Sequence, residues 1–347
     1  MQDKVQVIKH AGKDFKILQI TDTQIIDPKQ MAFPTRLRKE EQEKWADIDK
    51  NCLHYVRALI EDTKPDMIVL TGDNVYGSFD ADGSNFIKLT DFIDEFGVPW
   101  APIFGNHDGE TYDLEDPRGA AFPWGKGYEW QMDYWLHNTK NCLFLRGPEG
   151  LDKSRHGNYV VEVKQDNKTV YALFMMDSHD EVTESYGLTK EQMDWYSRHI
   201  EQLSDENGKI IPSMLFLHIP LYQHYLAIQQ YFPDGMGVIC QKGEVLPNGD
   251  WGELADPPTF SDALYQKFSK YVWETVQKHG STKAIIVGHY HTEACRINYK
   301  GENDAHAVQM VFGVKTSTYD YHKQLGGTLI TIKDGNDAPV ILPVYCN

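Results

Sequence analysis

The sequence predicts an α/β fold in which buried parallel strands alternate with amphipathic helices. Five short apolar runs, rich in Ile, Val, Leu and Phe, each stop at a polar residue of a kind that binds metals. In the first third of the chain, these runs alternate with segments whose apolar residues recur at helical spacing. Short apolar runs with polar boundaries are typical of buried strands. A strand–helix–strand rhythm favours parallel strands joined by right-handed crossovers.

The first third of the chain supplies three strands and two helices. We expect strands at residues 15–21, 66–71 and 100–104, because each is a continuous apolar run. Between them, residues 41–61 and 85–96 carry apolar side chains at helical spacing, which predicts two helices.

The middle of the chain is less regular. Residues 109–150 are rich in Gly, Pro and aromatic residues, so we expect a long loop that shapes a site, with one helix at 129–137. Strand patterns return at 159–163 and 170–176, and a helical pattern follows at 189–203.

The last third returns to regular elements. An apolar run that ends at His218 predicts another strand. The polar stretch 232–258 contains Gly and Pro and is typical of a surface loop or lid. We expect a helix at 260–279, a strand at 283–287, and three or four strands within 294–344.

Composition restricts the class of protein. The 347 residues show no internal repeat or linker, so we expect a single domain that covers residues 1–347. The net charge of −17 argues against a nucleic-acid partner. It does not exclude phosphorylated substrates, because bound metal ions dominate the field of their own site. Five scattered cysteines without CxxC spacing favour free thiols.

No targeting or membrane segment is visible. No run reaches the roughly 18 apolar residues of a membrane span. The residues after Met1 lack the pattern of a secretory signal, so we expect a cytoplasmic protein by default. Export with a signal already removed is the alternative.

Polar residues of metal-ligand type follow the predicted strands. In open α/β sheets, ligands bind just beyond the carboxyl ends of the strands. Taken singly, an Asp there is typical of a turn or helix cap and a His of a packed core. Together they form an oxygen and nitrogen ligand set suited to two first-row metal ions. The residues are Asp22, Asp73, Asn106, His107, Asp108, His218, His289 and His291.

These residues resemble the five blocks of the calcineurin-like metallophosphoesterases, and in particular the purple-acid-phosphatase-like branch. Segments such as TGDNVYG and PWAPIFGNHD extend the resemblance over residues 15–332. The blocks are Asp22-x-Gln24, Gly72-Asp73, Gly105-Asn106-His107-Asp108, His218 and Gly288-His289-x-His291.

The resemblance implies a four-layer sandwich of two mixed β-sheets flanked by helices, with two metal ions (Fe, Mn or Zn) above the strands. Asp73 would bridge both ions. His107 would lie beside the leaving group, and Asp108 would orient it. The other implied ligands are Asp22 and His291 for the first metal, and Asn106, His218 and His289 for the second.

The sequence departs from the family at Gln24. Most members have a histidine ligand there, whereas purple acid phosphatases have glycine and use a tyrosine three residues after the second-block aspartate. That position is Tyr76 here. We expect Tyr76 to bind the first metal; the alternatives are coordination by the Gln24 amide oxygen, or by neither side chain.

The implied activity is hydrolysis of phosphate monoesters on small substrates, by in-line attack of a metal-bound hydroxide. Asn106 and His107 would contact the substrate. The alternatives are a phosphodiesterase acting on small nucleotide or lipid-derived diesters, and a non-catalytic metal-binding relative, which only Gln24 supports. Oligomeric state is not predicted. Further pocket or substrate-contact candidates are His179, Asp180, Tyr319, Asp320 and His322.

Overall fold

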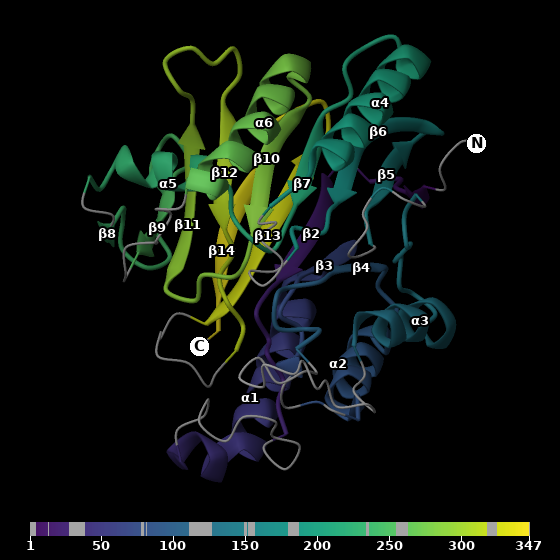
Figure 1. Ribbon diagram of the computed structural model, residues 1–347, viewed down its shortest axis with the longest axis vertical. Coiled ribbons are helices and arrows are strands. Elements are labelled where there is room, and N and C mark those ends of the chain that lie inside the picture. Colours follow the sequence, from purple (N-terminus) through teal and green to yellow (C-terminus); the bar gives the residue numbers. More distant parts are fainter. Residues whose placement is uncertain are drawn as a thin grey trace.

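Two β-sheets packed face to face form the centre of the protein (Figure 1). One sheet has nine strands and the other has five, and each contains both parallel and antiparallel pairs. Helices cover the outer faces, so the expected sandwich of two mixed sheets is confirmed. The computed structural model describes residues 5–12, 14–27, 39–77, 80, 82–110, 127–148, 151, 157–179, 187–233, 236–254, 263–317 and 325–346.

The five-stranded sheet contains the strands and helices predicted for the first third of the chain. Its three parallel strands are neighbours, as the strand–helix rhythm predicts. Helix α1 contacts β2 and β13 on its outer face. In sheet order the strands are β14 (Val340–Tyr345), β13 (Gly326–Lys333), β2 (Asp14–Ile20), β3 (Met67–Thr71) and β4 (Trp100–Ile103). The helices are α1 (Lys39–Thr63), α2 (Ser84–Asp94) and α3 (Tyr128–Asn138).

The nine-stranded sheet carries the remaining strands. Its outer face packs against α4 (Lys190–Asn207), α5 (Tyr222–Gln229) and α6 (Ala263–His279). In sheet order the strands are β1 (Gln6–Lys9), β5 (Tyr159–Gln165), β6 (Lys168–Met175), β7 (Ser213–Phe216), β10 (Thr282–Val287), β12 (Val308–Phe312), β11 (Glu293–Tyr299), β9 (Trp251–Leu254) and β8 (Gly237–Val238).

Burial on both faces explains why the central strands are continuously apolar. In β10, Ala284 and Ile286 belong to the core between the two sheets. Their neighbours Ile285 and Val287 belong to the core beneath the helices. Because successive side chains of a strand point to opposite faces, such a strand needs an apolar residue at every position.

The segment 232–258 is only partly the surface loop or lid that its composition suggests: residues 239–249 are exposed or half-buried turns and irregular backbone, but strands lie on either side of them. Its described part contains β8 and β9, which extend the nine-stranded sheet at one edge. Trp251 is buried and donates its indole N–H to the Ile341 carbonyl. Asp250 forms a buried ion pair with Arg296 on β11. Gly and Pro marked the turns, but the buried tryptophan shows that this segment is anchored to the sandwich.

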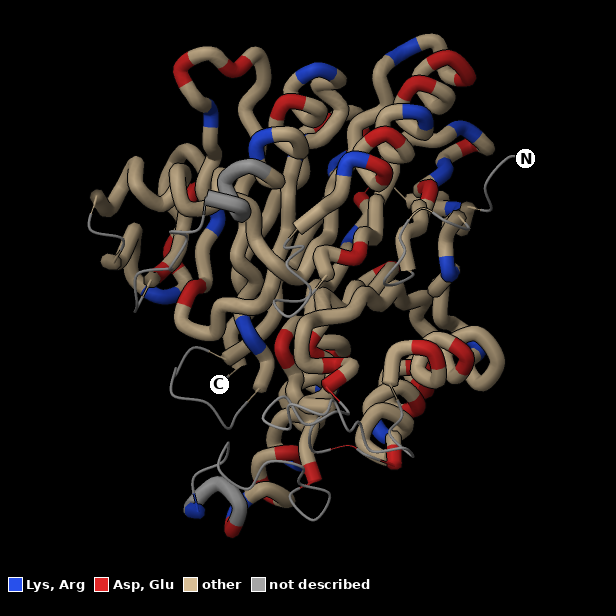
Figure 2. Tube along the Cα trace, in the orientation of Figure 1, with Lys and Arg blue, Asp and Glu red and all other residues tan. Residues whose placement is uncertain are grey.

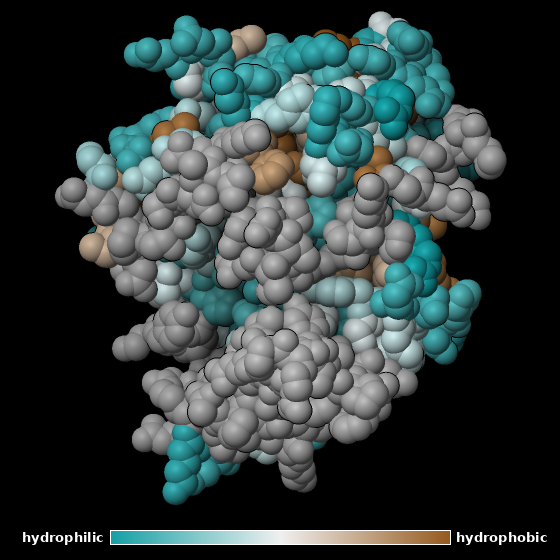
Figure 3. Space-filling model, in the orientation of Figure 1, coloured by the Kyte–Doolittle hydropathy of each residue, from teal (hydrophilic) through white to brown (hydrophobic). Residues whose placement is uncertain are grey.

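The surface is polar and rich in acidic residues, as the charge predicts. Lys, Arg, Asp and Glu are distributed over the helices and turns rather than gathered into one basic face (Figure 2). Hydrophilic residues also dominate the upper part of the view, over α4 and α6 (Figure 3). None of the helices within the described ranges is long and apolar enough to cross a membrane. The five cysteines are free thiols, of which Cys52 and Cys295 are buried.

Candidate metal centre

The predicted ligand residues meet where the carboxyl ends of strands from both sheets lie side by side. Asp22, Asp73 and Asn106 follow β2, β3 and β4 of the five-stranded sheet. His218 and His289 follow β7 and β10 of the nine-stranded sheet. Backbone hydrogen bonds join these ends within each sheet, from Asp22 to the Gly72 carbonyl and from Gly288 to the His218 carbonyl.

Several of these residues leave their strands in a left-handed backbone conformation. Asp22, Asp73 and His289 have φ angles of 53°, 49° and 74°. Non-glycine residues rarely adopt such angles, which cluster at functional sites where the surrounding structure imposes them. The neighbouring glycines allow this crowding: a methyl group on Gly105 would collide with the Asp73 carboxylate, and one on Gly288 with Asp22.

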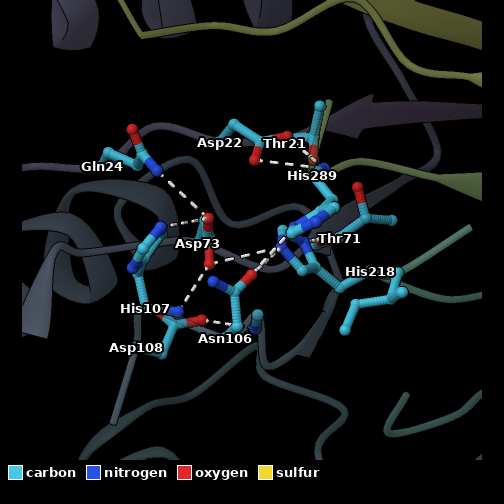
Figure 4. Close-up of polar contacts among 12 residues, drawn as sticks. Thr21, Asp22, Gln24, Thr71, Asp73, Asn106, His107, Asp108, His218 and His289 are labelled. Atoms are coloured by element: carbon cyan, nitrogen blue, oxygen red, sulfur yellow. Dashed lines mark hydrogen bonds and ion pairs between the residues drawn. The ribbon is translucent and has the colours of Figure 1, made fainter. Parts of the chain in front are cut away.

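The side-chain oxygen of Asn106 lies close to ring nitrogens of two histidines (Figure 4). Its Oδ1 lies 3.0 Å from His218 Nε2 and 2.9 Å from His289 Nδ1. The second ring nitrogen of His218, Nδ1, donates to the Thr71 carbonyl at 2.8 Å. A carbonyl only accepts, so this bond fixes the ring orientation and turns Nε2 toward the centre.

The carboxylates of Asp22 and Asp73 form the other side of the centre. Asp22 Oδ1 lies 3.2 Å from His291 Nε2, and Asp73 Oδ1 lies 3.3 Å from His218 Nε2. One ligand atom from each of Asp22, Asp73 and His218 lies within 4.8 Å of the others. Asp73 therefore lies close both to His218 and to Asp22, which contacts His291. This position is consistent with a carboxylate shared by two ions.

Burial and charge act in opposite directions on these groups. Burial raises the pKa of the Asp73 carboxyl, but the charges of His218 and His107 hold it well below its usual value. Burial lowers the pKa of His218, but Asp73 raises it overall to about 9. For Asp22, burial is outweighed by the hydrogen bond and charge of His291, and its pKa is lowered. A metal ion binding here would therefore have to displace protons from imidazole.

The donor set fits a pair of first-row metal ions. It combines carboxylate, amide and imidazole groups, which suit Mn, Fe and Zn. Several ligand groups also have supporting hydrogen bonds: Thr21 Oγ1 donates to Asp22 at 2.6 Å, and the His107 backbone N–H donates to Asp73 at 2.9 Å. Supporting contacts of this kind orient metal ligands and tune their affinity.

Gln24 and Tyr76 occupy different surroundings. Gln24 is buried, and its amide nitrogen donates to Asp73 Oδ2 at 3.1 Å. The Tyr76 ring stacks on His107, with a centroid distance of 4.3 Å and an interplanar angle of 19°. Which of the two binds a metal stays a prediction; the hydrogen bond places the Gln24 amide directly beside Asp73.

His107 lies at the edge of the centre, and its carboxylate partner differs from the expected one. Its Nε2 lies 4.0 Å from Asp73 Oδ2, and its Nδ1 lies 2.9 Å from Glu110 Oε2. The Asp108 carboxylate instead accepts backbone N–H groups from Gly105 (2.7 Å) and Val75 (3.0 Å). Asp108 therefore holds the loop that carries Asn106 and His107, whereas Glu110, which the sequence did not single out, faces the imidazole.

Ser178 and His179 follow β6, and Ser178 supports the centre through the backbone of His218. Ser178 Oγ accepts the backbone N–H groups of His218 (3.2 Å) and Ile219 (2.9 Å). His179 is buried, has a φ of 64°, and places its Nδ1 3.0 Å from the Gly187 carbonyl. Ser178 was missed because a serine after a strand has no distinctive spacing. The candidates Asp180, Tyr319, Asp320 and His322 lie outside the described residues.

Known proteins resemble this chain in sequence. The sequence model of the family described as "Calcineurin-like phosphoesterase" matches residues 15–293. "Probable inactive purple acid phosphatase 28" of Arabidopsis thaliana is 30% identical over 226 residues, covering 60% of this chain and 54% of that protein. "Phosphatase DCR2" of Saccharomyces cerevisiae is 28% identical over 188 residues, covering 50% and 30%. The chain thus spans about half, or less, of the length of these relatives.

A solved structure, a dimetal phosphatase from Danio rerio, aligns with 95% of this chain and 98% of its own chain. Its sequence identity is 13% and its TM-score is 0.49.

Proposed function

Since this chain belongs to the calcineurin-like phosphoesterase family, we propose that it is a dinuclear metal-dependent phosphoesterase that hydrolyses phosphate monoesters of small molecules. One observation supports this most: six potential ligands from the ends of five strands in two sheets converge around Asp73. We also propose that residues 1–347 form a single domain, because both sheets share one core.

The ligand roles follow the two groups of contacts. Asn106, His218 and His289 hold one metal ion, Asp22 and His291 hold the other, and Asp73 is shared. Metal ions in such a pair supply Lewis-acid activation of water and stabilise charge on the phosphoryl oxygens.

Gln24 completes the first site through its amide oxygen. Its amide nitrogen already reaches Asp73. A half-turn of the amide group would bring its oxygen to the same position, where it could bind a metal ion. Tyr76, stacked on His107, is then not a ligand. Tyrosinate bound to ferric iron absorbs visible light. Because Tyr76 does not bind the metal in this proposal, the iron-loaded protein should be colourless. A purple protein that loses its colour in Tyr76→Phe would reverse this assignment.

His107 provides the acid for the leaving group. It is partly exposed, its Nε2 faces the shared carboxylate, and it is not needed to hold a metal. Proton donation by a positioned side chain typically contributes about 10²–10⁴-fold to a rate.

Two other functions remain testable. A phosphodiesterase would use the same ligands with a different substrate pocket. A non-catalytic role is suggested by Gln24 at a usual histidine position and by the word "inactive" in the name of the Arabidopsis relative. That name describes the relative; this chain retains His107 and all six proposed ligand residues.

Metal content and turnover separate these three functions. We expect the purified protein to hold about two metal ions per chain, measured by mass spectrometry, and to hydrolyse 4-nitrophenyl phosphate faster than bis(4-nitrophenyl) phosphate. The reverse preference would indicate a phosphodiesterase. An inert protein with stoichiometric metal would indicate a binding role.

Two variants test the division of roles. Asp73→Ala should lose metal, because both ions share this carboxylate. His107→Ala should keep metal and lose most turnover. Equal metal loss in both variants would contradict the proposed roles.

A further inference from the structure

We propose that Tyr128 and Gln131, three residues apart on α3, position the backbone of residues 105–109 for phosphoester hydrolysis. That backbone carries Asn106, a proposed metal ligand, and His107, which the proposed function places beside the leaving group. This inference rests on the proposed phosphoesterase function and assigns two residues to it. Neither residue needs to touch the substrate or a metal, so both are positioning residues that act through the segment 105–109.

Both side chains bind backbone carbonyl groups of this segment. The Tyr128 hydroxyl donates to the Gly105 carbonyl at 3.1 Å. The Gln131 side-chain amide donates to the Asp108 carbonyl at 2.7 Å. Residues three apart on a helix lie on the same face, and the two carbonyl groups that they bind are also three residues apart. The helix therefore holds the segment at two points, one on each side of the two functional residues.

Aromatic packing fixes α3 against both ends of the same segment. Phe104, the residue before the segment, stacks on Trp135 with a centroid distance of 4.7 Å and lies edge-to-face with Tyr128 at 4.9 Å. Gly109, at the other end, has no side chain, and a Cβ there would collide with the Tyr128 ring. The Trp135 indole N–H also donates to Thr90 of α2 at 3.2 Å. The position of α3 is therefore set by the core and is imposed on the segment.

The bond from Gln131 closes a turn that is already held from inside. Gln131 is 1% exposed, and because a carbonyl only accepts, the amide nitrogen must be the end that faces Asp108. The carboxylate of Asp108 accepts the backbone N–H groups of Gly105 and Val75. Asp108 thus contacts the turn through its side chain and α3 through its carbonyl. A misplacement of about 1 Å can cost about 100-fold in rate, so these bonds should matter for activity.

The two bonds should affect different properties of the centre. The Gly105 carbonyl belongs to the peptide group that continues into Asn106, whose side-chain oxygen lies close to two histidines of the proposed metal site. The Asp108 carbonyl lies beyond His107 in the chain. Loss of the first bond should therefore loosen a metal ligand. Loss of the second should displace the side chain beside the leaving group.

Metal affinity tests the role of Tyr128. Tyr128→Phe removes the hydroxyl and keeps the ring that packs against Phe104 and Gly109. The variant should bind Mn²⁺ about 10–100-fold more weakly than the wild type, as measured by isothermal titration calorimetry of protein stripped of metal. Saturating Mn²⁺ should restore its kcat. Tyr134→Phe is the matched control, because Tyr134 lies on the same helix and its hydroxyl donates to Asp91 of α2 instead.

Turnover at saturating metal tests the role of Gln131. Gln131→Met keeps the length of the side chain and removes the donor. Its kcat for 4-nitrophenyl phosphate should fall by about 10–100-fold, while KM and metal content change little and added Mn²⁺ does not restore the rate. Gln202→Met is the matched control, because Gln202 is an exposed residue of α4 that donates to Glu206. If Gln131→Met does not fold, Gln131→Ala replaces it, since the space that it opens allows water to bind the Asp108 carbonyl.

Urea unfolding separates a positioning role from a merely structural one. A variant that unfolds at lower urea but matches its control in metal affinity, kcat and KM would overturn the proposal for that residue. A wild type that binds two metal ions and hydrolyses no ester would overturn the proposed function and, with it, the role of Gln131; the metal affinity of Tyr128→Phe would still decide the role of Tyr128. An active wild type whose two variants both match their controls would overturn only the positioning role.

Discussion

Replacing Ser178 by alanine should destabilise the protein and weaken its hold on metal. The Ser178 hydroxyl is fully buried and accepts the backbone N–H groups of His218 and Ile219. Alanine leaves both donors buried without an acceptor. Each unsatisfied buried donor costs about 1–3 kcal/mol. Because the bond from His218 is long at 3.2 Å, we expect a total loss of about 2–4 kcal/mol.

The effect on metal follows from the position of His218. Its imidazole is a proposed ligand, and its backbone would lose an anchor while Thr71 still holds the ring. Urea denaturation with and without chelator measures the stability loss, and dialysis against graded chelator measures metal retention. Ser204→Ala is the control, because the Ser204 hydroxyl only donates to the Ile200 carbonyl within α4. That variant should stay within about 0.5 kcal/mol of the wild type. A Ser178→Ala protein as stable and as metal-retentive as this control would refute the reasoning.

Three further changes probe the centre and its support. Gly105→Ala would place a methyl group against the shared aspartate, so metal content should fall while far-ultraviolet circular dichroism is retained. Burial lowers the pKa of His224 to about 3, whereas unfolded histidine titrates near ~6.5. The unfolded chain therefore binds an extra proton as pH falls from 6.5, and His224→Gln should reduce the acid-induced stability loss between pH 6 and pH 4 by up to about 1.4 kcal/mol per pH unit; parallel urea curves for both proteins would contradict this. Asp250→Asn leaves Arg296 as a buried charge without its partner and should cost about 3 kcal/mol or more, whereas Asp14→Asn, at an exposed pair, should cost far less.

The fold was predictable wherever the burial of an element gives its sequence a recognisable apolar pattern. Strands β2, β3, β7 and β10 are buried on both faces, so their apolar runs stand out from the polar residues at their ends. Helices α1, α2, α4 and α6 have apolar stripes of the length expected. Strand β1 was missed because it has only four residues, and two of them are exposed. Its pairing with β5 joins residues 155 positions apart, such as Gln6 and Val161, which no local sequence pattern can predict.

The ligand residues were predictable from their positions, but their supporting contacts were not. Each proposed ligand lies two to four residues beyond the end of a strand, so topology brings it to the shared edge. The partner of His107 depends instead on how the loop turns after Gly105. Asp108 turns inward to bind backbone N–H groups, and the next acidic residue, Glu110, takes the place beside the ring. Sequence spacing shows that two carboxylates follow His107, and only the turn geometry decides between them.

The proposed centre would take its ligands from both β-sheets, and hydrogen bonds near it cross from one sheet to the other. Gln19 of β2 donates to the Val287 carbonyl of β10, and His218 after β7 donates to Thr71 of β3. Metal ions bound by residues of both sheets would stabilise the packing of one sheet on the other, since ligands that bind only the folded state stabilise it by mass action. Removing the ions should increase local opening between the two sheets. Amide hydrogen exchange should then become faster first at the carboxyl ends of β3 and β10, while exchange in turns far from the site stays unchanged.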